Sequence, residues 1–369
     1  MIPTQSEGPA GADERVHVLD LPLAESRATL ERSLESLGER PFRARQILNQ
    51  VYRQRVRAFD GMTDLPTSLR GRLAERLRVG LLELSHRAAS KDGTVKYLWR
   101  LPDGQEIESV TMPTEGHLSF CISSQVGCAL HCRFCATASL GLRRNLSQGE
   151  MVDQVLAMLG DTEVLAPTPS LSVVFMGMGE PGYNMDAVLA ACRVLNSPDG
   201  LGIGARHLTI STAGVVPAIQ QMAAEPLQIR LAVSLHSGDQ SRREALMDVA
   251  KRFPLNELLV TCQQYQHATG RRITFEYAVM PGINDSPRDA VDLADFAGAV
   301  PSKINLIPFN PVEGFDVPSS SERDATRFRA ELVRRYTGDV MIRRTRGRDI
   351  EAACGMLHRS RATASGVPS

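Results

Sequence analysis

The chain has 369 residues, of which 43% are apolar, and its 42 basic and 42 acidic side chains give a formal net charge of zero. This size and composition predict a folded protein with one large catalytic domain and a smaller one, and exclude a chain that is disordered throughout. The sequence contains no run of about 18 apolar residues and no secretory signal pattern, so we expect a cytoplasmic protein without a membrane span.

The first part of the chain predicts a basic helical module. Residues 1–14 are small and polar, and we expect them to be disordered. The stretches "FRARQILNQVY" and "TSLRGRLAERL" each place apolar residues on one helix face: Ala44, Ile47, Leu48 and Val51 in the first, and Leu69, Leu73 and Leu77 in the second. We therefore assign residues 15–92 to a helical accessory domain.

Basic side chains are concentrated in two regions of the chain, one in this module and one near the C-terminal end. Residues 40–78 contain ten Lys/Arg against three Asp/Glu, and residues 323–361 contain eleven against five. Two basic ends around a more acidic middle could bind a polyanion, because phosphate contacts depend on clustered positive charge. Ordinary solvated helix faces remain an equally good explanation of the charge alone.

The rest of the chain predicts an α/β fold. Residues 93–116 read as a connecting pair of strands joined at "PDG". Residues 117–357 alternate between strand and helix patterns, and residues 358–369 are expected to form a flexible tail. The strand candidates are residues 118–123, 171–177, 206–212, 229–236, 271–279 and 303–310. Six parallel strand–helix units are fewer than the eight of a closed barrel, so we predict an open, partial parallel β/α barrel.

Several polar and glycine residues stand where the predicted strands end. In a parallel barrel this is the edge at which chemistry occurs. Each of these residues is also compatible with a polar group that is satisfied at an ordinary strand end. The candidates are Cys121, Gly179, Glu180, Ser211, Ser234, Leu235, His236 and Asn310.

The stretch "FCISSQVGCALHCRFCATA" holds four of the seven cysteines. In a reducing compartment, clustered thiols are more often metal ligands or catalysts than disulfides. Cys128, Cys132 and Cys135 have C-x3-C-x2-C spacing, which suits a [4Fe–4S] cluster with one open iron. A structural zinc site normally needs four ligands, and Cys121 could supply the fourth. A zinc-stapled RNA-binding protein without catalysis is therefore an alternative.

The C-x3-C-x2-C motif, followed by "VVFMGMGEP", resembles the radical S-adenosylmethionine superfamily. The resemblance implies that the open iron of the cluster binds S-adenosylmethionine, which one electron then cleaves to a 5′-deoxyadenosyl radical. It also implies that Gly179 and Glu180 form the turn that binds the methionine part of this cofactor. Ser211, residues 234–236 and Asn310 would supply further contacts.

A longer series of motifs resembles the RlmN/Cfr family of RNA adenine methyltransferases. These motifs occur in order between about residues 40 and 357: "PFRARQILNQVY", "MTDLP", "CISSQVGCALHCRFCATA", "GMGEP", "HLTISTAGVVP", "AVSLHS", "NLIPFNP" and "RGRDIEAACG". The extended N-terminal region and "MTDLP" favour the RlmN type, which methylates carbon 2 of adenine. The Cfr type, which methylates carbon 8, is the nearest alternative.

This resemblance implies a reaction with two thiols, because the electron-poor carbon 2 of adenine cannot attack a sulfonium methyl group. Cys354 would take a methyl group from one S-adenosylmethionine, and a second would provide the radical. Glu108 would accept the carbon-2 proton. Cys121 would then resolve the adduct by forming a disulfide with Cys354, which must be reduced in every turnover.

The same resemblance implies the partners. The substrates would be adenosine 2503 of 23S rRNA and adenosine 37 of some tRNAs, with the basic module contacting the RNA backbone. An external, flavodoxin-like electron donor would reduce the single [4Fe–4S] cluster. We expect the protein to act as a monomer.

Overall fold

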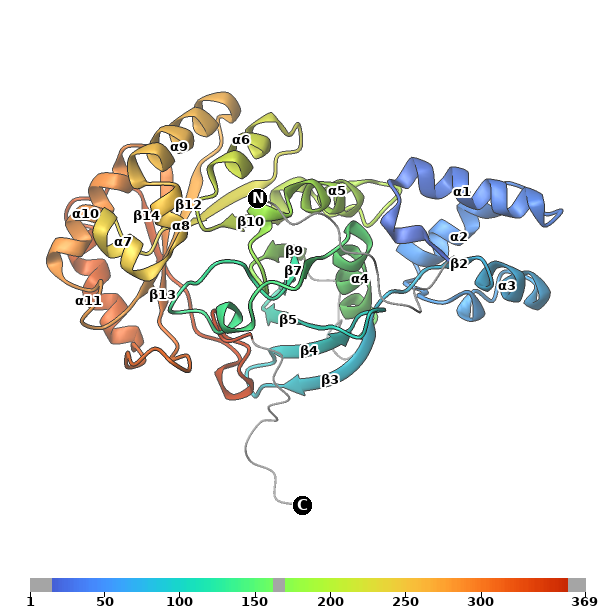
Figure 1. The fold of residues 1–369 in the computed structure, drawn as a ribbon, viewed down its shortest axis with the longest axis horizontal. Helices are drawn as coiled ribbons and strands as arrows, with labels where there is room; N and C mark the ends of the chain where they lie inside the picture. Colours follow the sequence, from blue (N-terminus) through green and yellow to red (C-terminus); the bar gives the residue numbers. More distant parts are fainter. Residues whose placement is uncertain (1–14, 162–169, 358–369) are drawn as a thin grey trace, which may run out of the picture.

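The structure, a computed structural model, describes residues 15–161 and 170–357. The predicted disordered N-terminus (1–14) and flexible tail (358–369) lie outside these residues. The described chain is organised around a 10-stranded sheet in the order β14-β13-β12-β11-β10-β9-β6-β5-β4-β3 (Figure 1).

The seven strands from β14 to β6 in this order are parallel to one another. They are β6 (His117–Cys121), β9 (Ser170–Phe175), β10 (Leu208–Thr212), β11 (Arg230–Ser234), β12 (Ile273–Val279), β13 (Ser302–Pro308) and β14 (Asp339–Ile342). Because the edge strands β14 and β3 do not pair with each other, the sheet stays open. The predicted open, partial parallel barrel is confirmed.

The crossover helices cover the outer face of this curved sheet (Figure 1). They are α4 (Gln148–Leu159), α5 (Met185–Asn196), α6 (Val216–Ala224), α7 (Gln240–Leu246), α8 (Val249–Arg252), α9 (Leu255–Thr269), α10 (Pro287–Gly298) and α11 (Glu322–Leu332). Three of them begin at a serine whose hydroxyl accepts from the third helical amide: Ser147, Ser286 and Ser321. None of the helices in the described residues is both long and apolar enough to cross a membrane.

Three antiparallel strands extend the sheet beyond β6. They are β5 (Glu106–Thr114), β4 (Val95–Arg100) and β3 (Glu83–Ala89). The sequence analysis expected β4 and β5 as a connecting pair, but β3 fell within the predicted helical segment 15–92. The antiparallel region is therefore part of the main sheet.

Both edges of the sheet escaped the sequence analysis for the same physical reason. An edge strand has few neighbours to pack against, so it does not need an alternating apolar pattern. In β3 only Ala88 is buried, and in β14 only Val340 is buried. β14 adds a seventh parallel strand to the six that were predicted.

The N-terminal module contains α1 (Leu23–Ser36), α2 (Arg43–Tyr52) and α3 (Thr67–Ala74), with the short strands β1 (Val16–His17) and β2 (Leu77–Arg78) pairing beside them. The apolar residues predicted for the two helix faces are buried, but α3 ends at Ala74, so Leu77 lies in β2 and not on the helix. Arg57 makes a two-point ion pair with the fully buried Asp153 of α4, at 2.7 and 2.6 Å. Arg55 donates to the carbonyl of Leu159 at 3.0 Å. Part of the basic charge thus docks the module onto the barrel.

Candidate active site

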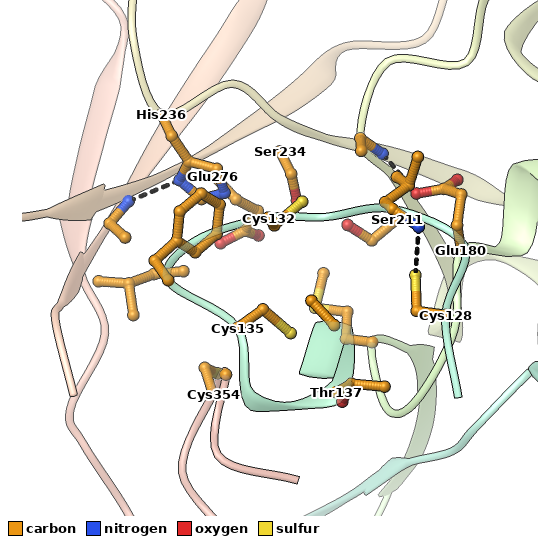
Figure 2. A pocket seen from close by; sticks show the side chains of 18 of the residues that line it. Cys128, Cys132, Cys135, Thr137, Glu180, Ser211, Ser234, His236, Glu276 and Cys354 are labelled. Carbon is orange, nitrogen blue, oxygen red and sulfur yellow. Dashed lines mark hydrogen bonds between the residues drawn. The ribbon is translucent and has the colours of Figure 1, made fainter. Parts of the chain in front are cut away.

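An open cavity of about 1030 Å³ lies at the carboxyl ends of the parallel strands. Figure 2 shows the side chains that line it, contributed by a loop after β6 and by the ends of β9 to β13. The sequence-predicted residues that line it are Cys128, Cys132, Cys135, Gly179, Glu180, Ser211, Ser234, His236, Asn310 and Cys354. Strand ends that are distant in the sequence therefore converge on one space.

The three thiols of the C-x3-C-x2-C motif face this space from one loop (Figure 2). The loop runs from β7 (Gln125–Val126) to η3 (Ala136–Leu140). Burial raises the pKa of Cys128 to about 12, and burial also raises the pKa of Cys132 and Cys135. Such thiols lose their protons only to a strong positive charge, which cluster irons provide.

The three thiols line one shared cavity, as ligands of a single cluster must. Ligands of one zinc ion must converge to roughly 2.1–2.3 Å from a common point. Thiols that each bind a different iron need not converge in this way, and the three thiols share a cavity wide enough for a cluster and a further ligand.

Glu180 lies buried at the turn after β9. One carboxylate oxygen accepts from the amide of Gly182 and the other from the amide of Ala213, both at 2.8 Å. Burial raises the pKa of this carboxyl group. Gly179 has a φ of 101°, and a Cβ there would lie 2.6 Å from the Cβ of Gln125. Only glycine fits this close approach.

His236 follows β11 in the left-handed conformation, with a φ of 57°. Its Nδ1 accepts from the amide of Ala278 at 2.9 Å, so the proton of the neutral ring lies on Nε2. Burial, together with the charge of Arg243, lowers the pKa of His236 to about 3. The ring packs edge-on against Phe134 of the thiol loop, with centroids 4.5 Å apart. His236 is therefore a fixed, neutral part of the cavity wall.

Leu235 is the one predicted strand-end residue that lines neither this cavity nor the second one described below. Its side chain is fully buried, and its carbonyl accepts from Nε of Arg243 at 3.2 Å. The same guanidinium donates to the carbonyl of Ala213 at 2.7 Å. Arg243 thereby joins the ends of β10 and β11, and its burial lowers its pKa to about 10.

The sequence analysis also missed two charged residues that line the cavity, Glu276 of β12 and Arg343 after β14. Nη1 of Arg343 lies 3.6 Å from Oε2 of Glu276, and Asn305 donates to Oε1 at 2.9 Å. The nearby Cys354 thiol raises the pKa of Arg343. Glu276 sits in an apolar strand pattern, and Arg343 follows the edge strand that was not predicted, so neither stood out.

A second cavity of about 630 Å³ adjoins the first. It is lined by both Cys121 and Cys354, which are far apart in the sequence, and Cys354 lines the first cavity as well. Both thiols are free. Burial, followed by the neighbouring Cys354, raises the pKa of Cys121 to about 12. Cys354 therefore lies at the boundary of the two cavities.

Glu108 lies on the same face of β5 as Val110, which lines the second cavity and pairs in register with Cys121. Its carboxylate is fully buried, and Nζ of Lys96 is 3.2 Å from its Oε1. The two charges compensate each other in this buried position. Glu108 itself lines neither cavity.

Known proteins resemble the chain over almost its whole length. A model of the radical SAM superfamily matches residues 122–294, and a model of the ribosomal RNA large subunit methyltransferase N-terminal domain matches residues 21–79. The dual-specificity RNA methyltransferase RlmN of Anaeromyxobacter dehalogenans is 43% identical over 330 residues, covering 88% of each chain. That of Alkalilimnicola ehrlichii is 42% identical over 347 residues, covering 93% of each chain.

A solved structure shows the same similarity in three dimensions. The crystal structure of a radical SAM methyltransferase from Sphaerobacter thermophilus superposes with a TM-score of 0.88 at 41% identity, covering 94% of this chain and 100% of that chain. The family resemblance of the sequence motifs is thus confirmed. The chain belongs to the RlmN family of dual-specificity RNA methyltransferases within the radical SAM superfamily.

Proposed function

We propose that this protein methylates carbon 2 of adenosine 2503 in 23S rRNA and of adenosine 37 in some tRNAs. Two molecules of S-adenosylmethionine are used per turnover, one as methyl donor and one as radical source. The observation that carries the proposal is the place of Cys354, which lines the cavity of the three loop thiols and also the cavity of Cys121. A thiol at this boundary can accept a methyl group on one side and react with a second thiol on the other.

The first cavity would hold the cofactors. Cys128, Cys132 and Cys135 would bind the [4Fe–4S] cluster, and Glu180 would face the ammonium group of S-adenosylmethionine. Together these cofactors supply a 5′-deoxyadenosyl radical. The neutral His236 offers a hydrogen-bond donor at the cavity wall without adding a charge.

The two catalytic thiols and Glu108 would act in sequence. The Cys354 sulfur loses its proton and attacks the methyl carbon of a sulfonium, and the bond between that carbon and the sulfonium sulfur breaks to release a thioether. A hydrogen atom is then removed from this S-methyl group, and the resulting carbon radical bonds to carbon 2 of the adenine. The radical adduct would return one electron to the cluster that Cys128, Cys132 and Cys135 would hold, which balances the electron used to form the radical, and Glu108 would take the carbon-2 proton. The Cys121 sulfur attacks the Cys354 sulfur, and the bond between that sulfur and the new methyl carbon breaks as the carbon gains a proton.

The disulfide between Cys121 and Cys354 needs two electrons from a reductant before the next turnover. A separate, flavodoxin-like donor would supply the electron for the cluster. We propose that the protein works as a monomer in the cytoplasm. The target base must be turned out of its stack to reach the thiols.

Nucleoside analysis tests the proposal directly. Digested 23S rRNA and tRNA from a deletion strain are compared by mass spectrometry with RNA from the same strain carrying this gene. We expect 2-methyladenosine to reappear at the two positions with the gene. The appearance of 8-methyladenosine would assign the protein to the Cfr type and contradict the proposal.

Anaerobic reconstitution separates the enzyme from a zinc-stapled RNA-binding protein. We expect the protein to bind iron and sulfide and to become brown. Stoichiometric zinc that iron and sulfide do not displace would favour the alternative.

A further inference from the structure

The turn between β3 and β4 (residues 90–94) contacts the segment that carries Cys354 (residues 343–357, the Cys354 segment). Asp92 uses both of its carboxylate oxygens in this region. Oδ1 accepts from the amide of Thr94 within the turn, and Oδ2 accepts from the amide of Gly347, each at 2.9 Å. The hydroxyl of Ser90 donates to Oδ1 of Asp349 at 2.6 Å. One short turn thus bonds to two points of the Cys354 segment.

Two further contacts from the antiparallel strands reach the same segment. Nη1 of Arg346 donates to the carbonyl of Pro113 at 2.9 Å. Nζ of Lys96, which also lies beside Glu108, donates to the carbonyl of Glu351 at 3.5 Å. The antiparallel extension of the sheet therefore supports the Cys354 segment. In Figure 1 this segment is the red loop beside the ends of β3 and β4.

The contacted part of the segment is a tight, closed turn. Gly347 has a φ of 60°, and a Cβ there would lie 2.8 Å from Cγ2 of Thr94. Glu351 is also left-handed, with a φ of 53°, and the amide of Ala352 closes the turn onto the carbonyl of Gly347 at 2.8 Å. A non-glycine residue persists in this conformation only where its surroundings hold it.

The other end of the segment is bonded to the thiol loop. The amide of Ala136 donates to the carbonyl of Gly355 at 2.7 Å, and the hydroxyl of Thr137 donates to the carbonyl of Leu357 at 2.7 Å. Cys354 lies between these two anchors. The downstream anchor belongs to the loop of the three thiols, whereas the upstream anchor lies outside residues 122–294, which match the superfamily model.

We propose that Asp92 is a positioning residue that holds the Cys354 segment so that Cys354 stays at the boundary of the two cavities. This inference rests on the proposed function, in which Cys354 must be reached first from the cofactor side and later by Cys121. Without the Asp92–Gly347 bond the upstream anchor loosens. Cys354 then leaves the boundary, while the loop thiols and the strand ends that line the first cavity remain in place.

Asp92→Asn is the sharpest variant. Asparagine also stabilises such turns through its side-chain oxygen, so the bond to Thr94 is retained. The oxygen that faces Gly347 is replaced by an amide group, which cannot accept a hydrogen bond. Asp103→Asn is the matched control, because Asp103 accepts from the amide of Gln105 at 3.0 Å in the next turn and contacts Arg144, which lies outside the Cys354 segment.

Two measurements on the reconstituted enzyme test the proposal. Hydrogen–deuterium exchange of residues 345–357 reports the anchoring, and the ratio of methylated RNA to 5′-deoxyadenosine reports the coupling of the radical to the product. In Asp92→Asn we expect exchange roughly tenfold faster and a ratio roughly tenfold lower, which corresponds to about 1.4 kcal/mol for the lost hydrogen bond to the carboxylate. A change confined to general stability would not alter this ratio.

The outcomes separate the two proposals. If Asp92→Asn matches Asp103→Asn in either measurement, Asp92 is not a positioning residue. If Cys354→Ala still methylates the RNA, the proposed function fails, whatever Asp92→Asn does.

Discussion

The thiol loop and the Cys354 segment meet in one cavity, but the chain holds them in different ways. The thiol loop is bonded partly within itself, for example from the amide of Cys135 to the carbonyl of Cys132 at 3.1 Å, and the amide of Arg133 joins it to the carbonyl of Leu246 at 3.1 Å. The Cys354 segment instead depends on side chains from distant parts of the sequence, among them Asp92 and Asn310. The three loop thiols share one short motif, so their place relative to one another is encoded locally, whereas the place of Cys354 relative to them depends on tertiary contacts alone.

The largest expected effects separate these two regions by chemistry. We expect Cys132→Ala to abolish both 5′-deoxyadenosine formation and RNA methylation, because two thiols cannot hold a cluster that needs three. Cys354→Ala should abolish RNA methylation alone, since it leaves all three cluster thiols intact. Iron content, 5′-deoxyadenosine and 2-methyladenosine are measured on the same preparations.

Cys192→Ala serves as the control for both variants. Cys192 is fully buried in α5 and lines neither cavity, so its loss should affect stability but neither product. If Cys354→Ala also loses iron, the two regions are not chemically separate.

The next effect concerns the resolving step. In Cys121→Ala, methyl transfer and radical addition can proceed, but no thiol remains to attack the Cys354 sulfur. We expect a covalent protein–RNA adduct to accumulate, visible as a shifted band on a denaturing gel and mapped to Cys354 by mass spectrometry of the nuclease-treated protein. Release of free, fully methylated RNA would remove Cys121 from the mechanism.

Two glycines allow a smaller and matched comparison. Gly179 and Gly347 both have positive φ values, 101° and 60°, and a Cβ at either would meet a neighbouring atom at less than 3.0 Å. An alanine at such a position costs about 1–2 kcal/mol. We expect Gly179→Ala to weaken binding of S-adenosylmethionine about tenfold, measured by calorimetry, whereas Gly347→Ala should leave this affinity unchanged and lower only the RNA product. Equal affinities in both variants would contradict the division of the two regions.

The same contrast explains what could be predicted from the sequence. The central strands are apolar runs that end in conspicuous motifs, so their order and the gathering of Glu180, Ser211 and His236 at one edge followed from local patterns. The meeting of Cys121 with Cys354 was implied only by family resemblance, because no local pattern links them. Strands β3 and β14 were missed because they lie at sheet edges. Asp92 lies in an ordinary turn of the sequence, and its contact with the amide of Gly347 exists only in the folded chain.

The smallest expected effect concerns His236, which lies in the wall of the first cavity beside the thiol loop. Burial lowers the pKa of His236 to about 3, compared with about 6.5 in an unfolded chain. Between these pH values the unfolded state binds a proton that the folded state does not. The contribution of His236 to folding stability is therefore complete above pH 6.5 and declines as the pH falls toward 3. At pH 5.5 the loss of stability is about 1.4 kcal/mol.

The variant His236→Asn tests this effect. The side-chain oxygen of asparagine can replace Nδ1 as acceptor for the amide of Ala278, asparagine tolerates the positive φ, and its side chain does not titrate. We measure the free energy of unfolding with urea at pH 7.5 and at pH 5.5. Between these pH values we expect it to fall by about 1.4 kcal/mol less in this variant than in the wild type. Exchange of the exposed His267 for asparagine is the control, and an equal pH dependence in all three proteins would show that His236 is not held neutral by the fold.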